Sequence, residues 1–252
     1  MAGKFYGVGV GPGNPELLTM KAIRCIKESN IIAMAVSRPD TLEVVYQKET
    51  TGENQKQYEK FLEGCIAYQI VHAVYPEIDE KEKLFLPMPM VKEKEALKQI
   101  HDACAEKTME LLCQGKQVAF ITLGDPTVYS TCLYVEKRIS RSGFETEFIP
   151  GITSFCAAAA RLGICLAENK EEIHIIPASY QVEDSLRLSG TKILMKTGSK
   201  MPFVKKTIME QGLEVRMVEN CGMETERIYD RVEEIPDQAG YYSLLILKEK
   251  KE

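Results

Sequence analysis

Residues 7–19 read Gly-Val-Gly-Val-Gly-Pro-Gly-Asn-Pro-Glu-Leu-Leu-Thr, and this stretch decides the fold. It overlaps an apolar run at residues 5–10 and leads into a helical pattern of apolar residues at 17–26. Glycine at every second position lets the backbone turn sharply and approach a ligand without hindrance from Cβ atoms. Pro15 suits the first turn of a helix, where its missing N–H is not needed. The stretch therefore predicts a strand, a glycine loop and a helix, the usual opening of an α/β site for a nucleotide-like ligand.

The glycine spacing excludes the two best-known nucleotide loops. A dinucleotide fingerprint has glycine at its first, third and sixth positions. The sixth position is Pro12 when counted from Gly7 and Asn14 when counted from Gly9. No Gly-Lys-Ser/Thr follows, as a phosphate-binding P-loop requires. A tight turn without any ligand stays open as the alternative.

Length and charge limit the class of protein. The chain has 252 residues, enough for two domains that each bury a core, and its net charge of −5 provides no basic field for nucleic acid or anionic lipid. No apolar run reaches the roughly 18 residues of a membrane span. The predicted first strand begins too early to leave room for a signal peptide. We therefore expect neither a nucleic acid nor a membrane partner.

The cysteines point to a reducing compartment. Eight are scattered along the chain without a Cys-x-x-Cys pair. Dispersed thiols in a chain without a signal peptide are typical of cytoplasmic proteins. Neither the cysteines nor the three histidines have the spacing of metal ligands, so we expect no protein metal site.

Up to residue 162 the chain alternates between predicted strands and helices. Apolar runs predict strands at 31–36, 84–86, 118–123 and 144–149, and apolar periodicity predicts helices at 65–74, 96–112, 127–142 and 155–162. Such alternation with short junctions indicates a mainly parallel sheet. The polar segment at 37–63 is interpreted as a surface excursion, a lid or rim that is partly helical near its end.

The pattern of apolar residues in the rest of the chain predicts a smaller α/β domain. Strands are expected at 173–177, 192–196, 214–219 and 241–247, helical segments at 182–188 and 202–211, and a strand or turn at 227–235. The sequence thus predicts an α/β protein of two domains. Residues 1–150 carry both the glycine loop and a Gly-Asp-Pro loop, and residues 151–252 form the second domain.

Three junctions are candidates for the site, at residues 9–13, 123–128 and 151–154. Each follows a predicted strand, and ligands of open α/β sheets lie beyond the carboxyl ends of the strands. We expect the three junctions to lie close together and to bind one ligand. Alternatives remain for single residues: Asp125 either caps the next helix or faces the ligand, and Thr153 and Ser154 are either helix caps or ligand contacts.

Three motifs together resemble the tetrapyrrole methyltransferase family: the glycine stretch at 8–19, Thr-Leu-Gly-Asp-Pro-Thr-Val-Tyr-Ser at 122–130 and Ile-Pro-Gly-Ile-Thr-Ser-Phe at 149–155. Finer detail at 121–131, 155–160 and 193–196 resembles the branch that methylates C20 of precorrin-2 or cobalt-precorrin-2. The resemblance implies the class III methyltransferase fold, two α/β domains with a cofactor cleft between them. It also implies S-adenosylmethionine as methyl donor, S-adenosylhomocysteine as product, a tetrapyrrole substrate of the cobalamin route and a homodimer.

The resemblance also implies site residues. Family cofactor contacts fall on Pro12, Leu123, Gly124, Asp125, Val128, Thr153 and Ser154, and in the second domain on Lys196 and Cys221, where relatives often have Met and a small residue. Because the substrate carries several carboxylates, we expect Gly11, Arg38 and Lys196 to contact it. A proton must leave or shift during the reaction. Tyr229 is the candidate acceptor, with Glu226 and His174 as alternatives.

Methyl transfer agrees with a site built from loops. A sulfonium is already activated, so the reaction chiefly needs its atoms held in line, and positioning alone can contribute about 7–11 kcal/mol. Two other functions remain open from the sequence. The chain could methylate another carbon of a corrinoid ring, or it could be a non-catalytic nucleotide-binding module that reuses the fold.

Overall fold

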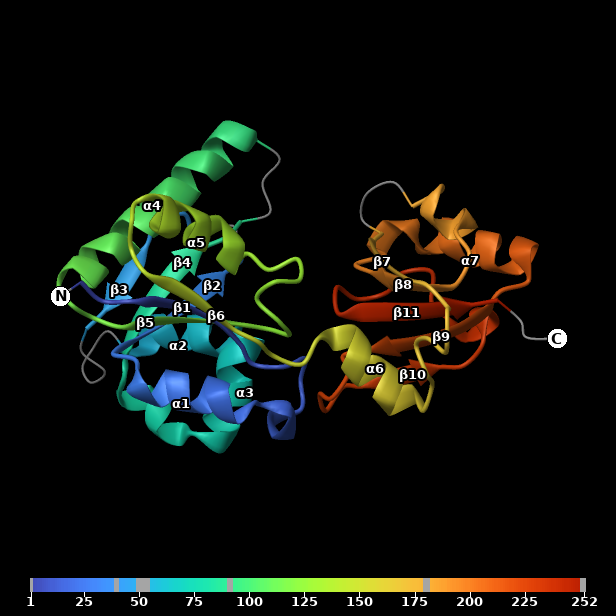
Figure 1. Cartoon of the computed structure of the whole chain (residues 1–252), viewed down its shortest axis with the longest axis horizontal. Helices are drawn as coiled ribbons and strands as arrows, with labels where there is room; N and C mark the ends of the chain where they lie inside the picture. Colours follow the sequence, from blue (N-terminus) through green and yellow to red (C-terminus); the bar gives the residue numbers. More distant parts are fainter. Residues whose placement is uncertain (1, 39–40, 49–54, 90–92, 179–181, 250–252) are drawn as a thin grey trace. The chain divides into compact units, whose positions relative to one another are not determined.

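The computed structural model describes residues 2–38, 41–48, 55–89, 93–178 and 182–249. The chain folds into two compact units, Met1–Thr153 and Ser154–Glu252. In each unit, helices cover both faces of one β-sheet (Figure 1). The chain is thus a mixed α/β protein with two sheets, as the sequence predicted.

The first unit contains a six-stranded sheet in the order β3-β4-β2-β5-β1-β6. Its strands are β1 Phe5–Gly9, β2 Ile31–Val36, β3 Val45–Gln47, β4 Glu82–Pro87, β5 Val118–Thr122 and β6 Thr146–Ile149. All neighbours pair in parallel except β3, which is antiparallel to β4 at the edge. The mainly parallel sheet is confirmed. The sequence did not predict β3, because three residues in a polar segment give no periodic signal and the strand depends on the free edge of β4.

Helices cover both faces of this sheet. On one face lie α1 Met20–Glu28, α2 Gln55–Glu63 and α3 Ile66–Val74, and on the other lie α4 Lys94–Cys113 and α5 Cys132–Arg141 (Figure 1). Strand residues alternate between two cores: Val8 packs with α1 and α3, and Phe5 packs with α4 and α5. Both side chains are fully buried, as expected for a central parallel strand.

Two predicted helix starts are wrong, and side-chain hydrogen bonds explain both. Pro15 opens a 3₁₀ turn that ends at Leu17, and α1 begins only at Met20 because the Thr19 hydroxyl caps its first turn. The helix predicted from residue 127 begins at Cys132. Residues 126–131 form a longer loop instead, in which the Asp125 carboxylate bonds the Thr127 amide.

The second unit contains a five-stranded sheet in the order β10-β9-β11-β8-β7. Its strands are β7 Ile173–Pro177, β8 Thr191–Met195, β9 Glu214–Glu219, β10 Arg227–Tyr229 and β11 Ser243–Lys248. Only β7 and β8 pair in parallel. Helix α6, Ser154–Leu162, covers one face and α7, Met201–Gln211, covers the other. The helix expected at 182–188 is only a 3₁₀ turn, Ser185–Arg187, in which the Arg187 amide donates to the carbonyl of Asp184, three positions back.

Within the ranges given above, none of the helices combines the length and the apolar character needed to cross a bilayer.

Candidate functional site

The strand order of the first sheet explains why three distant loops can share one site. Strands β5, β1 and β6 are immediate neighbours and run parallel, with Gly9 opposite Thr122 and Val8 opposite Ile149. Their carboxyl ends therefore lie together at one edge of the sheet. We name the segments that follow them the glycine loop (residues 9–13), the aspartate loop (residues 123–131) and the proline loop (residues 150–153).

The glycine and aspartate loops are joined through their backbones. The Gly11 amide donates to the Gly124 carbonyl at 3.2 Å, and the Gly124 amide donates back to the Gly11 carbonyl at 2.7 Å. Both residues have left-handed backbones, with φ of +81° and +71°. Glycine is the residue that adopts this conformation without steric cost. These two glycines thus fix the distance between the two loops.

The proline loop lies against the same junction. A Cβ atom on Gly9 would come within 2.6 Å of both the Gly124 carbonyl oxygen and the Gly151 nitrogen. A Cβ atom on Gly151 would come within 2.2 Å of the Gly124 oxygen. Real Cβ atoms essentially never approach other atoms this closely. The expectation that the three loops meet is confirmed by this close packing of Gly9, Gly124 and Gly151.

Asp125 braces the aspartate and proline loops with both carboxylate oxygens. Oδ2 accepts a hydrogen bond from the Gly151 amide at 3.0 Å. Oδ1 accepts from the Thr127 amide at 2.8 Å and also from the Thr127 hydroxyl. The residue is only 7% exposed. Asp125 therefore does not cap α5, and its carboxylate serves to hold loop backbone in place.

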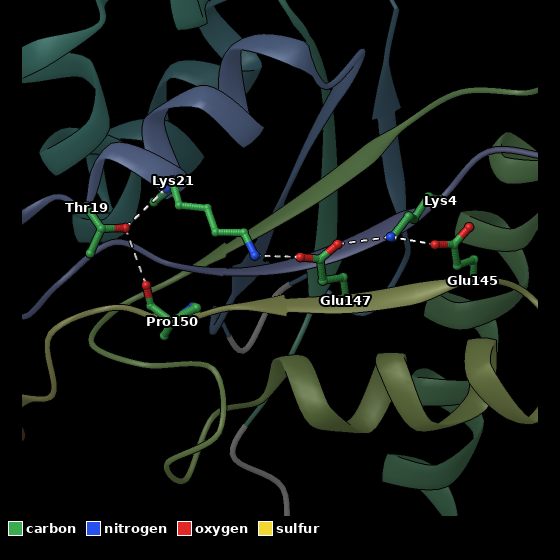
Figure 2. Close-up of polar contacts among 7 residues, drawn as sticks. Lys4, Thr19, Lys21, Glu145, Glu147 and Pro150 are labelled. Carbon is green, nitrogen blue, oxygen red and sulfur yellow. Dashed lines mark hydrogen bonds and ion pairs between the residues drawn. The ribbon is translucent and has the colours of Figure 1, made fainter.

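Thr19 connects the start of α1 to the proline loop. Its hydroxyl accepts a hydrogen bond from the Ala22 amide at 3.1 Å and donates one to the Pro150 carbonyl at 3.4 Å (Figure 2). Nearby, the Glu147 carboxylate bridges Lys21 and Lys4, which lowers the pKa of Glu147 through the two side-chain hydrogen bonds (Figure 2). The proline loop is thus held from β6 and from α1.

Replacing Thr19 with valine is expected to lower the free energy of unfolding by about 1 kcal/mol, because loss of an N-cap side chain destabilises a helix by roughly that amount. Chemical denaturation measures it. Thr19→Ser should behave like wild type. Lys21→Met is a matched control on the same helix, since it removes only a half-exposed ion pair worth about 0.5 kcal/mol. If Thr19→Val and Lys21→Met lowered the free energy of unfolding equally, the hydrogen bonds of the Thr19 hydroxyl would contribute no more than an exposed ion pair.

The proline loop also carries a polar atom without a partner. Thr153 Oγ1 is buried and has no hydrogen-bond partner in the described part of the chain. It does not cap α6, so that alternative is not supported for Thr153. A buried hydroxyl without a partner costs about 1–3 kcal/mol unless something else bonds it. This unpartnered hydroxyl, beside the junction of the three loops, fits a bound cofactor with polar atoms.

The two candidate residues of the second unit lie at equivalent strand ends. Lys196 follows β8 and Cys221 comes two residues after β9; these strands run parallel to each other on either side of β11. Lys196 and Asn220 both have left-handed backbones, with φ of +59° and +53°. For lysine this costs about 1–2 kcal/mol. Burial, with Glu226 nearby, raises the pKa of the Cys221 thiol to about 11, so the thiol is neutral near pH 7.

Side chains around Cys221 hold its loop in one conformation. Glu226 accepts hydrogen bonds from the Arg161 Nε atom at 2.6 Å and from the Gly222 amide at 2.8 Å. The Tyr229 hydroxyl donates to Glu219 Oε2 at 3.3 Å. Glu226 is thus engaged in a structural link, whereas Tyr229 has a carboxylate beside its hydroxyl that could share a proton.

The remaining candidates are placed more simply. Pro12, Gly11 and Gly124 are buried, Leu123, Val128 and Ser154 are partly exposed, and Arg38 is exposed just after β2. His174 lies on the edge strand β7, where its Nε2 atom is 2.9 Å from the Ser189 carbonyl oxygen. Over the residues that the structure describes, no three His, Cys, Asp or Glu side chains are grouped to hold a metal ion.

Sequence reasoning missed two residues that shape the loops. Thr127 stands two positions after Asp125, the spacing of an Asx turn, and this local signal could have predicted the bond to its amide. Thr19 stands three positions before Ala22, the spacing of an N-cap, but its bond to Pro150 spans 131 positions and leaves no local trace. Hydrogen bonds between residues so far apart in the sequence can be identified only once the fold is known.

Comparison with known proteins now identifies the family. The family model of the Tetrapyrrole (Corrin/Porphyrin) Methylases matches residues 4–236. The chain belongs to this family. A protein of Methanocaldococcus jannaschii named "Probable cobalt-precorrin-2 C(20)-methyltransferase" is 33% identical, with 97% of this chain and 96% of that protein covered. The cobalt-precorrin-2 C(20)-methyltransferase of Salmonella typhimurium is 27% identical, with 99% and 98% covered.

Solved structures of tetrapyrrole methylases share the fold. The uroporphyrin-III C-methyltransferase of Thermus thermophilus, solved in complex with S-adenosylhomocysteine, superposes with a TM-score of 0.64 at 20% identity, covering 98% of both chains. The α/β class and the resemblance to tetrapyrrole methylases are therefore confirmed. The match to the family model includes all three loops of the first unit and the ends of β8 and β9 in the second.

Proposed function

We propose that this chain transfers a methyl group from S-adenosylmethionine to C20 of precorrin-2 or cobalt-precorrin-2 in cobalamin biosynthesis, giving the intermediate at the precorrin-3A level. The observation that carries methyl transfer is the junction of three rigid loops beside a buried, unpartnered Thr153 hydroxyl. Full-length similarity to methyltransferases named for C20 supports the choice of carbon.

The proposed cofactor contacts lie in the three loops and at two strand ends. They are Pro12, Leu123, Gly124, Asp125, Val128, Thr153 and Ser154 in the loops, with Lys196 and Cys221 at the strand ends. S-adenosylmethionine supplies a methyl group that its sulfonium has already activated. The task of the loops is then to bind and orient, and backbone groups locked by mutual hydrogen bonds do this without moving. The Thr153 hydroxyl gains the hydrogen bond it lacks, and the neutral Cys221 thiol contacts the ligand without attacking it.

The proposed substrate contacts are Gly11, Arg38 and Lys196. Arginine and lysine suit the carboxylates of a tetrapyrrole, and Gly11 offers close approach of its backbone. Tyr229 is the proposed proton acceptor. Its hydrogen bond to Glu219 supports this role, because the phenol can pass its own proton to that carboxylate as its oxygen takes the proton from C20. Cobalt, where present, belongs to the substrate.

Assembly and location are also proposals. We infer a homodimer in the cytoplasm, with residues 1–150 and 151–252 as its functional domains. The compact units at Met1–Thr153 and Ser154–Glu252 support the division. All eight cysteines are free thiols, which suits a reducing compartment.

A second candidate is methylation at another ring carbon. The cobalt-precorrin-4 C(11)-methyltransferase of Methanocaldococcus jannaschii is 23% identical over 81% of this chain. The loops bind the same donor in either case, so the residues named above for the cofactor do not distinguish the two reactions. A non-catalytic module would bind S-adenosylhomocysteine but leave the tetrapyrrole unchanged.

The decisive experiment uses S-adenosylmethionine with a ¹³C-labelled methyl group, under anaerobic conditions, with metal-free and with cobalt-loaded precorrin-2. We expect one added methyl group by mass spectrometry and the label at C20 by NMR. Calorimetry should show S-adenosylhomocysteine bound near one per chain, and no binding of NAD or ATP. A label at any other carbon would select the second candidate. Tight S-adenosylhomocysteine binding without methyl transfer to either substrate would favour the non-catalytic module.

A further inference from the structure

Two tyrosines form an exposed aromatic pair beside the ends of β8 and β9. Tyr241 is 50% exposed and Tyr242 is 41% exposed, directly before β11. Their rings meet edge to face, with centroids 5.2 Å apart. Strand β11 pairs with both β8 and β9, so the residues before it lie next to Lys196 and Asn220. The pair therefore borders the strand ends that carry the second unit's proposed contacts.

The Lys196 ammonium lies over the ring of Tyr241. The Lys196 Nζ atom is 5.3 Å from the centroid of the Tyr241 ring, within cation–π range. Among the described residues, no carboxylate lies within 4.0 Å of this ammonium. Its backbone is left-handed, a conformation in which glycine or asparagine would be unstrained. A strained lysine at an exposed aromatic surface points to a role for its side chain.

Hydrogen bonds of the Glu219 side chain and of the backbone fix the conformation of this surface. Glu219 Oε1 accepts from the Gly240 amide, and the Asn220 amide donates to the Tyr242 carbonyl at 3.1 Å. Glu219 Oε2 accepts from Tyr229. Both oxygens of this acidic side chain are thus occupied by the protein itself. The loop before β11 is fixed to the end of β9, and the ammonium and the ring are prearranged for a ligand.

We propose, on the basis of the proposed function, that Lys196 and Tyr241 form one substrate subsite. The Tyr241 ring packs against a pyrrole-derived ring of the tetrapyrrole, and the Lys196 ammonium binds one of its carboxylates. The chemistry matches on both counts, because the substrate combines flat apolar rings with several carboxylates. Contact with Tyr241 keeps the ammonium in place before the substrate arrives, so less side-chain freedom is lost on binding.

The test compares three variants of the full-length chain. Lys196→Asn removes the ammonium and relieves the strain of the left-handed backbone. Tyr241→Leu removes the aromatic ring, and Tyr241→Phe keeps it. Anaerobic titration with cobalt-precorrin-2 should show a dissociation constant raised about tenfold in Lys196→Asn and about fivefold in Tyr241→Leu, with less than about a twofold change in Tyr241→Phe. Lys206→Asn is the matched charge control, because Lys206 is exposed on α7 of the same unit. Its dissociation constant should equal that of wild type.

Thermal unfolding separates a binding role from a structural one. Lys196→Asn should unfold at the same temperature as wild type or higher, since asparagine accepts the left-handed backbone. A lower unfolding temperature together with weaker binding would overturn the inference in favour of a structural lysine. So would unchanged substrate binding in both Lys196→Asn and Tyr241→Leu, or a change of oligomeric state in Tyr241→Leu.

Failure of the proposed function gives a different result. In that case the wild-type chain binds S-adenosylhomocysteine but does not bind the tetrapyrrole, and the subsite falls with the function. If wild type binds the tetrapyrrole and the variants bind it equally well, only the subsite is wrong. Calorimetry with S-adenosylhomocysteine on Tyr241→Leu should give the wild-type constant, because the inference assigns the ring to the substrate.

Discussion

Replacing Gly151 with alanine is expected to lower the free energy of unfolding by about 3 kcal/mol and to abolish binding of S-adenosylhomocysteine. The new Cβ atom would lie 2.2 Å from the Gly124 carbonyl oxygen and 2.7 Å from the Gly9 carbonyl carbon. Both neighbours are backbone atoms, which cannot rotate away as a side chain can. The proline loop must therefore shift as a whole, and that shift also stretches the hydrogen bond from the Gly151 amide to Asp125.

Chemical denaturation and calorimetry measure the two effects, and Gly64→Ala is the matched control. The nearest atom to a Cβ on Gly64 is the Lys60 carbonyl oxygen at 3.5 Å, an ordinary contact. Gly64→Ala should therefore leave both quantities unchanged within error. Gly9→Ala approaches the same junction from the other side and should resemble Gly151→Ala. If Gly151→Ala were as stable as wild type and still bound the ligand, the three loops could not be packed as described.

The sequence predicts the parts of this junction better than their arrangement. Three loops after three strands followed from apolar runs that end at glycine and proline, and these signals are local. The order β5-β1-β6, which makes those loops neighbours, has no local signal, because the chain passes through α1 to α4 between β1 and β5. The rule that ligands lie beyond the carboxyl ends of strands supplied the expectation that the loops meet, and the parallel pairing of Val8 with both Ile121 and Ile149 is its physical reason.

Side-chain roles were harder to predict than positions. Asp125 was identified as either a helix cap or a ligand contact, yet its carboxylate bonds one amide two residues ahead and another 26 residues away. The predicted start of α5 was wrong for the same reason. The periodicity of apolar residues carries no signal for a turn that a single carboxylate stabilises. The left-handed backbone of Lys196 could not be predicted, since lysine is not among the residues that favour this conformation.

Asp125→Ala is expected to lower the free energy of unfolding by about 2–3 kcal/mol and to weaken S-adenosylhomocysteine binding by at least about tenfold. The carboxylate is buried, and its removal leaves the Gly151 and Thr127 amides without their acceptor. Asp125→Asn should lie between wild type and Asp125→Ala. Its single carbonyl oxygen can serve one amide, while its NH₂ group must face the other donor.

A matched pair of variants decides whether Asp125 acts by bracing the loops. Thr127→Val removes only the hydroxyl that donates to Oδ1 and keeps both amide bonds, so it should cost about 1 kcal/mol in the wild-type background. In Asp125→Ala the same change should cost nothing, because its acceptor is gone. Additive losses in the double variant would contradict the brace. Weaker ligand binding at wild-type stability in Asp125→Ala would instead make the Asp125 carboxylate itself a ligand contact and not a brace, since an interaction with the ligand alone leaves the free protein unchanged.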